Sequence, residues 1–77
     1  MTVEEFILKI EVEFPDMEPG KLLPDSVFRE VMNWNSINAL ILIALVDTEY
    51  DVILTADDLR ASITINDIFK LIESRQP

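Results

Sequence analysis

The chain contains no histidine and no cysteine, and its 77 residues include a single glycine. Without histidine, a nucleophilic triad has no imidazole base, and without both residues zinc lacks its usual ligands. Disulfides are excluded, so packing alone must stabilise the fold. Gly20 stands alone, which excludes a glycine-rich phosphate loop. The sequence therefore predicts no metal site and no catalytic residues, although composition does not strictly exclude a hydrolase that uses two carboxylates.

Positive charge is also scarce. Six lysines and arginines stand against 15 aspartates and glutamates, which gives a net charge of −9 and a pI near 4.1. Such a chain repels nucleic acid and anionic membranes, and attracts partners that present lysine and arginine. The acids are spread over both halves of the chain, so a second interpretation is that they only keep a small protein soluble.

Long apolar runs are absent too. The longest stretch without charge covers residues 31–46 and begins with several polar side chains, whereas a membrane span needs about 20 mostly apolar residues. The first residues are acidic, with no basic region before an apolar stretch, so no secretory signal is expected. We expect one domain over residues 1–77, without a membrane span, in the cytoplasm.

The sequence does contain residue patterns that predict where helices begin and end. Thr2 followed by Glu5 fits a capping box, and Pro15 predicts the end of the helix that Thr2 opens. Apolar residues recur at helical spacing between them, namely Val3, Phe6, Ile7, Ile10 and Phe14. A long connection follows, with a turn signal at Pro19-Gly20. The connection is apolar enough to pack down at Leu22, Leu23, Val27, Phe28 and Val31.

Three further helices are expected after this connection. Asn35 or Ser36 caps a helix that runs to about Tyr50. Capping-box patterns open a short helix after Thr55 and a last helix after Thr64. The last helix has one apolar stripe, formed by Ile65, Ile68, Phe69 and Ile72. With no strand-like alternation, the sequence predicts an all-α fold: an irregular antiparallel four-helix bundle with three longer helices, one short helix and a long loop between the first two.

Alternating acids at residues 47–51 resemble part of a calcium-binding loop. Such a loop requires glycine at its sixth position and a bidentate glutamate at its end. Here these positions hold Val52 and Asp58. The pattern therefore indicates a solvated helix end, with at most weak and non-specific binding of divalent cations.

Ser36 stands where the long connection becomes a helix that starts without charged residues. A helix N-terminus presents free N–H groups and a partial positive charge, which suits a phosphodiester, and a hydroxyl there is easily reached. Taken alone, the pattern is more typical of a serine that merely caps a helix. Local sequence leaves both interpretations open.

The segment Trp34-Asn35-Ser36-Ile37 resembles the Asp-Ser-Leu attachment motif of acyl carrier proteins, in the Trp-Asp-Ser form of D-alanyl and synthase-type carriers. The resemblance extends in order over almost the whole chain, at Asp25-Ser26-Val27-Phe28, Asp47-Thr48-Glu49-Tyr50, Val52-Ile53-Leu54, Asp57-Asp58-Leu59 and Thr64-Ile65-Asn66-Asp67-Ile68. Asp25-Ser26-Val27 fits the triplet itself, but no long apolar helix follows it. We therefore interpret Ser26 as a turn or cap residue.

This resemblance implies a carrier rather than an enzyme. A phosphopantetheinyl transferase would attach 4'-phosphopantetheine from coenzyme A to Ser36, and the arm would carry an acyl or aminoacyl thioester to partner enzymes of fatty-acid, polyketide or related synthesis. The protein would act as a monomer. Apolar residues between the helices, such as Leu42, Val46 and Leu59, could enclose an aliphatic cargo. The alternative is a helical interaction module of the same fold that has lost the prosthetic group.

Two departures from the family pattern affect recognition. Asn35 stands where the family usually has aspartate, so contact with the basic site of the transferase is expected to weaken. The family often has acids just after the serine, whereas here the residues are uncharged. We expect partners to bind the second helix mainly through apolar contact, assisted by acids at its end. The predicted contact residues are Ile37, Leu40, Ile41, Ala44 and Asp47.

Overall fold

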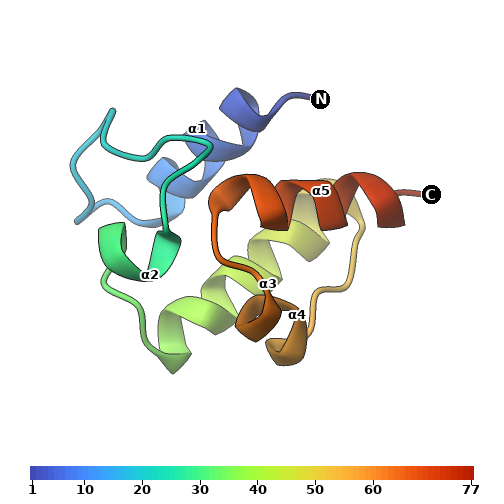
Figure 1. The fold of residues 1–77 in the computed structure, drawn as a ribbon. Coiled ribbons are helices and arrows are strands. Elements are labelled where there is room, and N and C mark those ends of the chain that lie inside the picture. The colour runs from blue at the N-terminus through green and yellow to red at the C-terminus, as the bar shows by residue number, and fades with distance from the viewer.

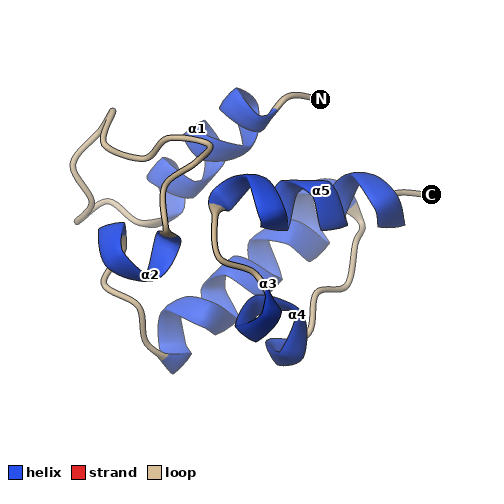
Figure 2. Cartoon of the chain, in the orientation of Figure 1, coloured by secondary structure: helices blue, strands red, loops and turns tan.

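Five helices follow one another along the chain, and no sheet forms (Figures 1 and 2). A computed structural model describes all residues from 1 to 77. The helices are α1 (Val3–Glu13), α2 (Phe28–Val31), α3 (Ser36–Tyr50), α4 (Ala56–Ala61) and α5 (Ile65–Arg75). The all-α prediction, with three longer helices and a long connection between the first two of them, is therefore confirmed.

The helix boundaries follow the capping residues. The side chains of Thr55 and Thr64 each accept a hydrogen bond from the N–H three residues on. The carboxylates of Asp58 and Asp67 in turn accept one from the cap N–H, so both predicted capping boxes form. Thr2 accepts from Glu5 at 3.1 Å without a return bond. Only half of that predicted box exists, because the N–H of Thr2 lies at the exposed chain start where water can satisfy it.

One contiguous core lies between the helices. Helix α1 packs against both α3 and α5. The predicted apolar stripes face this core, since Phe6, Ile7, Ile10 and Phe14 of the first segment and Ile65, Ile68, Phe69 and Ile72 of the last are all buried, with Val3 half-buried. Aromatic contacts join the helices: the Phe6 ring meets that of Tyr50 edge-on at 5.9 Å and lies tilted to that of Phe69 at 6.0 Å, measured between ring centroids.

The connection between α1 and α3 contains a helix that the sequence did not predict, the single turn α2. A four-residue helix is too short to show helical periodicity. The connection packs down on one side only: Leu22 and Phe28 are buried, but Leu23 and Val31, which we expected to pack, are exposed. Backbone carbonyls of the connection also accept the first N–H groups of α5, which fixes the loop to that helix: the acceptors are Ser26 at 3.1 Å and Pro24 at 2.8 Å.

The start of α3 lies at the opposite end of the molecule from both chain termini (Figure 1). Residues at the start of α3 are therefore far from the N- and C-terminal ends. None of the five helices combines the length and the apolar character that a membrane span requires.

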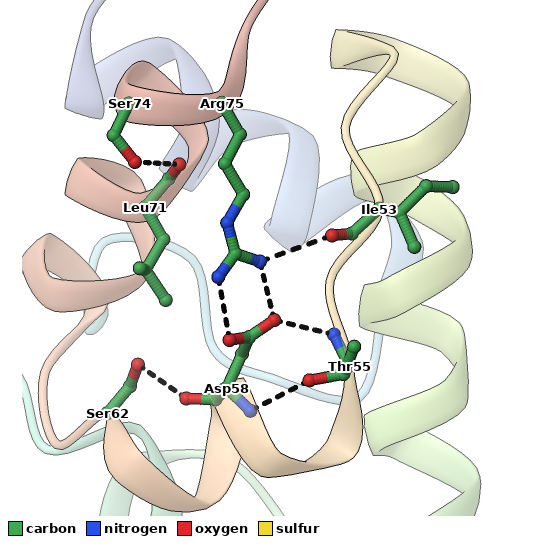
Figure 3. A network of polar contacts seen from close by, with 7 residues as sticks. All are labelled: Ile53, Thr55, Asp58, Ser62, Leu71, Ser74 and Arg75. Atoms are coloured by element: carbon green, nitrogen blue, oxygen red, sulfur yellow. Dashed lines mark hydrogen bonds and ion pairs between the residues drawn. The ribbon is translucent and has the colours of Figure 1, made fainter.

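The short helix α4 is held to α5 by an ion pair near its start. Arg75 donates to both carboxylate oxygens of Asp58, at 2.6 and 2.9 Å, and also to the backbone oxygen of Ile53 at 3.3 Å (Figure 3). The same carboxylate accepts from the N–H of Thr55 at 2.8 Å. The hydrogen bonds from Arg75 and then from the Thr55 backbone hold the pKa of Asp58 well below its usual range. One ionised side chain thus joins the start of α4 to the end of α5.

This carboxylate gives a prediction for stability against pH. Because the pKa of Asp58 is lower in the folded state, the group stabilises the fold above its unfolded pKa, near 4, and this contribution is lost as pH falls through the lower folded pKa. Asp58→Asn should therefore lower the melting temperature by a few degrees at neutral pH. The difference from wild type should shrink towards pH 2, as measured by thermal circular dichroism.

Asp57→Asn is the matched control, since it removes the same charge from the same helix. Asp57 pairs only with Arg60, and both side chains are largely exposed. Such a pair contributes at most about 1 kcal/mol. Equal losses in the two variants at neutral pH would contradict the role assigned to Asp58.

Candidate functional site

Ser36 is the first residue of α3, and its neighbour Asn35 is the cap. The Asn35 side-chain oxygen accepts the N–H of Asn38 at 2.8 Å, and the Asn35 backbone is extended, with φ −155°. The side-chain amide of Asn38 donates back to the carbonyl of Asn33, which closes the loop before the helix. Of the two predicted caps, the structure thus selects Asn35 and leaves Ser36 without a capping role.

The Ser36 hydroxyl differs from the other serine hydroxyls of this chain in its hydrogen bonding. The other three are engaged locally: Ser26 accepts the N–H of Leu23 at 2.8 Å, and Ser62 and Ser74 donate to backbone carbonyls of their own helices or helix ends. The Ser36 hydroxyl makes no hydrogen bond within the protein, and the residue is exposed. The prediction that Ser26 is a turn residue is confirmed, because its N–H also bonds the carbonyl of Leu23.

The start of α3 also presents unpaired donors. Asn35 satisfies the N–H groups of Asn38 and Ala39 through its side chain and its carbonyl. The N–H groups of Ser36 and Ile37 have no protein acceptor, and the first turn carries no acid. Two free amides and the positive end of a 15-residue helix therefore surround the Ser36 hydroxyl, an arrangement compatible with a phosphate group.

A partly open groove of about 400 Å³ begins at Ser36 and runs between α3 and α4. Its walls are mainly apolar and include Trp34, Ala39, Leu40, Ile43, Ala56 and Leu59. Trp34 is fixed by the buried ring of Phe28, which it meets edge-on at 4.8 Å. The groove is thus shaped by α2 and the loop before α3 as well as by the two helices.

Two arginines, Arg29 and Arg60, complete the groove. Arg29 is half-buried, its guanidinium lies 4.6 Å from the Phe28 ring centre, and it donates to the backbone oxygens of Ser62, at 2.7 Å, and Leu59. Sequence reasoning missed both arginines as groove residues. Nothing near Arg29 in the sequence indicated this position, because its two acceptors lie 30 and 33 residues away.

The cargo residues suggested by the sequence separate into two groups. Leu59 lines the groove, whereas Leu42 and Val46 are fully buried in the core and line no hollow. Filling the space beside these two would require the core to open. Of the three residues expected to enclose a cargo, only Leu59 therefore lies in the groove beside Ser36, and Leu42 and Val46 do not.

The predicted docking residues differ in their exposure to solvent. Ile37 and Leu40 are 69% and 66% exposed, and Ala44 and Asp47 are exposed as well. Ile41 is half-buried and packs against the core on the side of α1. Ile41 is therefore in part a packing residue, unlike the exposed Leu40.

Acids gather only at the far end of α3. Glu49 pairs with Lys9 of α1 at 3.5 Å, and Asp51 ends the helix in the left-handed conformation, with φ 55°. No group of three or more acidic side chains lies close enough together to hold a metal ion. The alternating acids at residues 47–51 thus form a helix end.

Comparison with known proteins identifies the fold. Neither a protein-family model nor a curated protein matches this chain. Among solved structures, the chain is similar to the solution structure of a holo acyl carrier protein from Geobacter metallireducens, with a TM-score of 0.77 and 16% sequence identity. The match covers 96% of this chain and 84% of the other. The fold of this chain is therefore that of an acyl carrier protein.

Proposed function

We propose that the protein is an acyl carrier that holds its cargo as a thioester on a 4'-phosphopantetheine arm attached to Ser36. The observation that carries the proposal is the state of this hydroxyl, which is exposed and unengaged at the head of α3, beside two free backbone amides. The similar fold of a holo acyl carrier protein supports the same assignment.

The residues around Ser36 fit the prosthetic group. A phosphodiester at the Ser36 oxygen would lie next to the free N–H groups of Ser36 and Ile37, and the positive helix end would stabilise its charge. The arm would supply a terminal thiol for thioester formation. The protein's own part is to present the hydroxyl, to hold it on a rigid helix and to keep acids away from the phosphate.

Attachment is the work of a separate transferase. The Ser36 oxygen would form a bond to the phosphate that bears pantetheine, and the transferase would remove the hydroxyl proton. The pyrophosphate bond of coenzyme A would break, and adenosine 3',5'-bisphosphate would leave. Loading and transfer enzymes would then bind the outer face of α3, where Ile37, Leu40 and Ala44 are exposed and uncharged. Such a face favours partners that combine an apolar patch with basic residues opposite Asp47. We further propose that the protein acts in the cytoplasm, as a monomer.

The test of the proposal is the intact mass of the protein after incubation with coenzyme A and a phosphopantetheinyl transferase of broad specificity. A gain equal to one phosphopantetheine supports the proposal. A folded protein that gains no mass with several transferases would instead favour the alternative, an interaction module of the same fold without the prosthetic group.

Asn35 provides a graded prediction. Aspartate and asparagine cap helices equally well, so Asn35→Asp should keep the helix content and add a negative charge that a basic transferase can contact. We expect modification of Asn35→Asp to be several-fold faster than that of wild type, as measured by the rate of mass gain. Asn33→Asp adds the same charge two residues earlier, outside the cap. Equal rates for all three proteins would show that Asn35 acts only as a cap.

A further inference from the structure

The groove beside Ser36 differs in charge from every other hollow of the molecule. Arg29 and Arg60 line it, and no carboxylate does. The three other hollows contain no lysine or arginine and are each lined by two acids: Glu13 with Asp16, Glu13 with Glu49, and Glu4 with Glu11. Among the hollows of a chain of net charge −9, this groove alone is lined by basic residues, and it is also mainly apolar.

The charge of Arg29 is not neutralised by the protein. Its two acceptors are backbone carbonyls, and it forms no ion pair with a carboxylate. The guanidinium has five N–H donors, of which two are used, so further donors remain for a ligand. Arg60 pairs only with Asp57, and that pair is exposed enough for the arginine to exchange partners. The groove therefore offers two cations to an anion.

We infer that this groove is the seat of the phosphopantetheine arm itself, with its phosphate held by the groove arginines and its apolar segment lying along the walls. This inference rests on the proposed function. The groups of the arm suit the residues that line the groove. The phosphate would be bonded to the Ser36 oxygen, in the hollow that the two arginines also line, and the apolar gem-dimethyl group could contact apolar wall residues such as Trp34 and Leu40. Seated this way, the arm is held against the protein and does not extend freely into solvent.

The test uses Ser36→Ala, which cannot be modified at this position, and free ligands in place of the attached arm. Pantetheine 4'-phosphate, pantetheine without phosphate, and inorganic phosphate are titrated separately into isotope-labelled protein, and backbone amide shifts are followed by NMR. We expect pantetheine 4'-phosphate to cause saturable shifts at Ala39, Leu40 and Leu59, and to bind more tightly than either of the other two probes.

Charge variants of the Ser36→Ala protein test whether Arg60 contacts the phosphate of the ligand. Arg60→Gln should weaken binding of pantetheine 4'-phosphate about fivefold, the effect of one exposed charge pair, and leave pantetheine unchanged. Lys70→Gln is the matched control, because it removes the same charge from an exposed position that lines no hollow. It should bind like the parent.

Several results would overturn the inference: no shifts with any probe, shifts outside the groove, equal binding of pantetheine with and without phosphate, or equal effects of the two charge variants. Inorganic phosphate that binds as tightly as the full ligand would show an ion site and not a seat for the arm. The mass measurement on wild-type protein is independent of these titrations. Groove binding in a protein that no transferase modifies would contradict the proposed function alone, and modification without groove binding would contradict this inference alone.

Discussion

Ser36→Ala is expected to abolish attachment of phosphopantetheine completely while leaving the fold intact. The loss should be complete because a methyl group cannot form the phosphodiester. Stability should hardly change, since the Ser36 hydroxyl is exposed, bonds nothing in the protein and is not the cap of α3. Intact mass spectrometry after incubation with transferase and coenzyme A gives the first result, and circular dichroism gives the second.

Two other variants make this experiment specific. Ser26→Ala removes the serine whose triplet also fits the attachment motif, but whose hydroxyl is held in a turn by the N–H of Leu23. We expect this variant to be modified. Thr48→Ala, on the exposed surface of α3, should be modified at the rate of wild type. Mass gain in Ser36→Ala, or its loss in Ser26→Ala with the fold intact, would assign the attachment site elsewhere.

Phe28→Ala should cause the largest loss of stability among simple truncations near the site. The ring is fully buried, contacts Trp34 edge-on at 4.8 Å and lies beneath the Arg29 guanidinium at 4.6 Å. Truncation of a buried phenylalanine typically costs about 3–5 kcal/mol. A domain of this size has a total stability on the order of 4–12 kcal/mol. The variant should therefore be partly unfolded at room temperature or unfold at much lower urea concentration.

Trp34 reports on this change directly, because it is the single tryptophan of the chain and it packs on Phe28. We expect its fluorescence to shift to the red in Phe28→Ala even where circular dichroism still shows helix. Val12→Ala, at a position that is 77% exposed, is the control and should unfold like wild type. A Phe28→Ala protein of near-native stability would mean that α2 does not support the groove.

The sequence predicted those parts of the fold that depend on residues close together in the chain. Capping boxes at Thr55 and Thr64 join residues three apart, and apolar stripes in α1 and α5 repeat every turn, so both can be read locally. The same reasoning failed for α2, which is one turn long, and for Leu23 and Val31, whose exposure depends on which side of the connection meets the core.

The candidate site was predicted in part for the same reason. Asn35 and Ser36 stand in a recognisable local pattern, and the structure places them at the cap and first residue of α3. The groove is made by segments far apart in the chain, and its charge comes from Arg29, which contacts backbone 30 and 33 residues away. Periodicity also placed Ile41 with Leu40 on one face, whereas the approach of α1 half-buries Ile41.

The separation of the chain termini from the start of α3 bears on how the protein can be handled and joined to others. Both ends lie away from Ser36, so an affinity tag, a fluorophore or a neighbouring domain attached at either end would leave the serine and its groove accessible (Figure 1). The C-terminal side tolerates less trimming, because Arg75, two residues before the last, anchors α4 through Asp58. Surface immobilisation through the N-terminus would therefore leave the Arg75–Asp58 contact undisturbed and the start of α3 accessible to a transferase or loading enzyme.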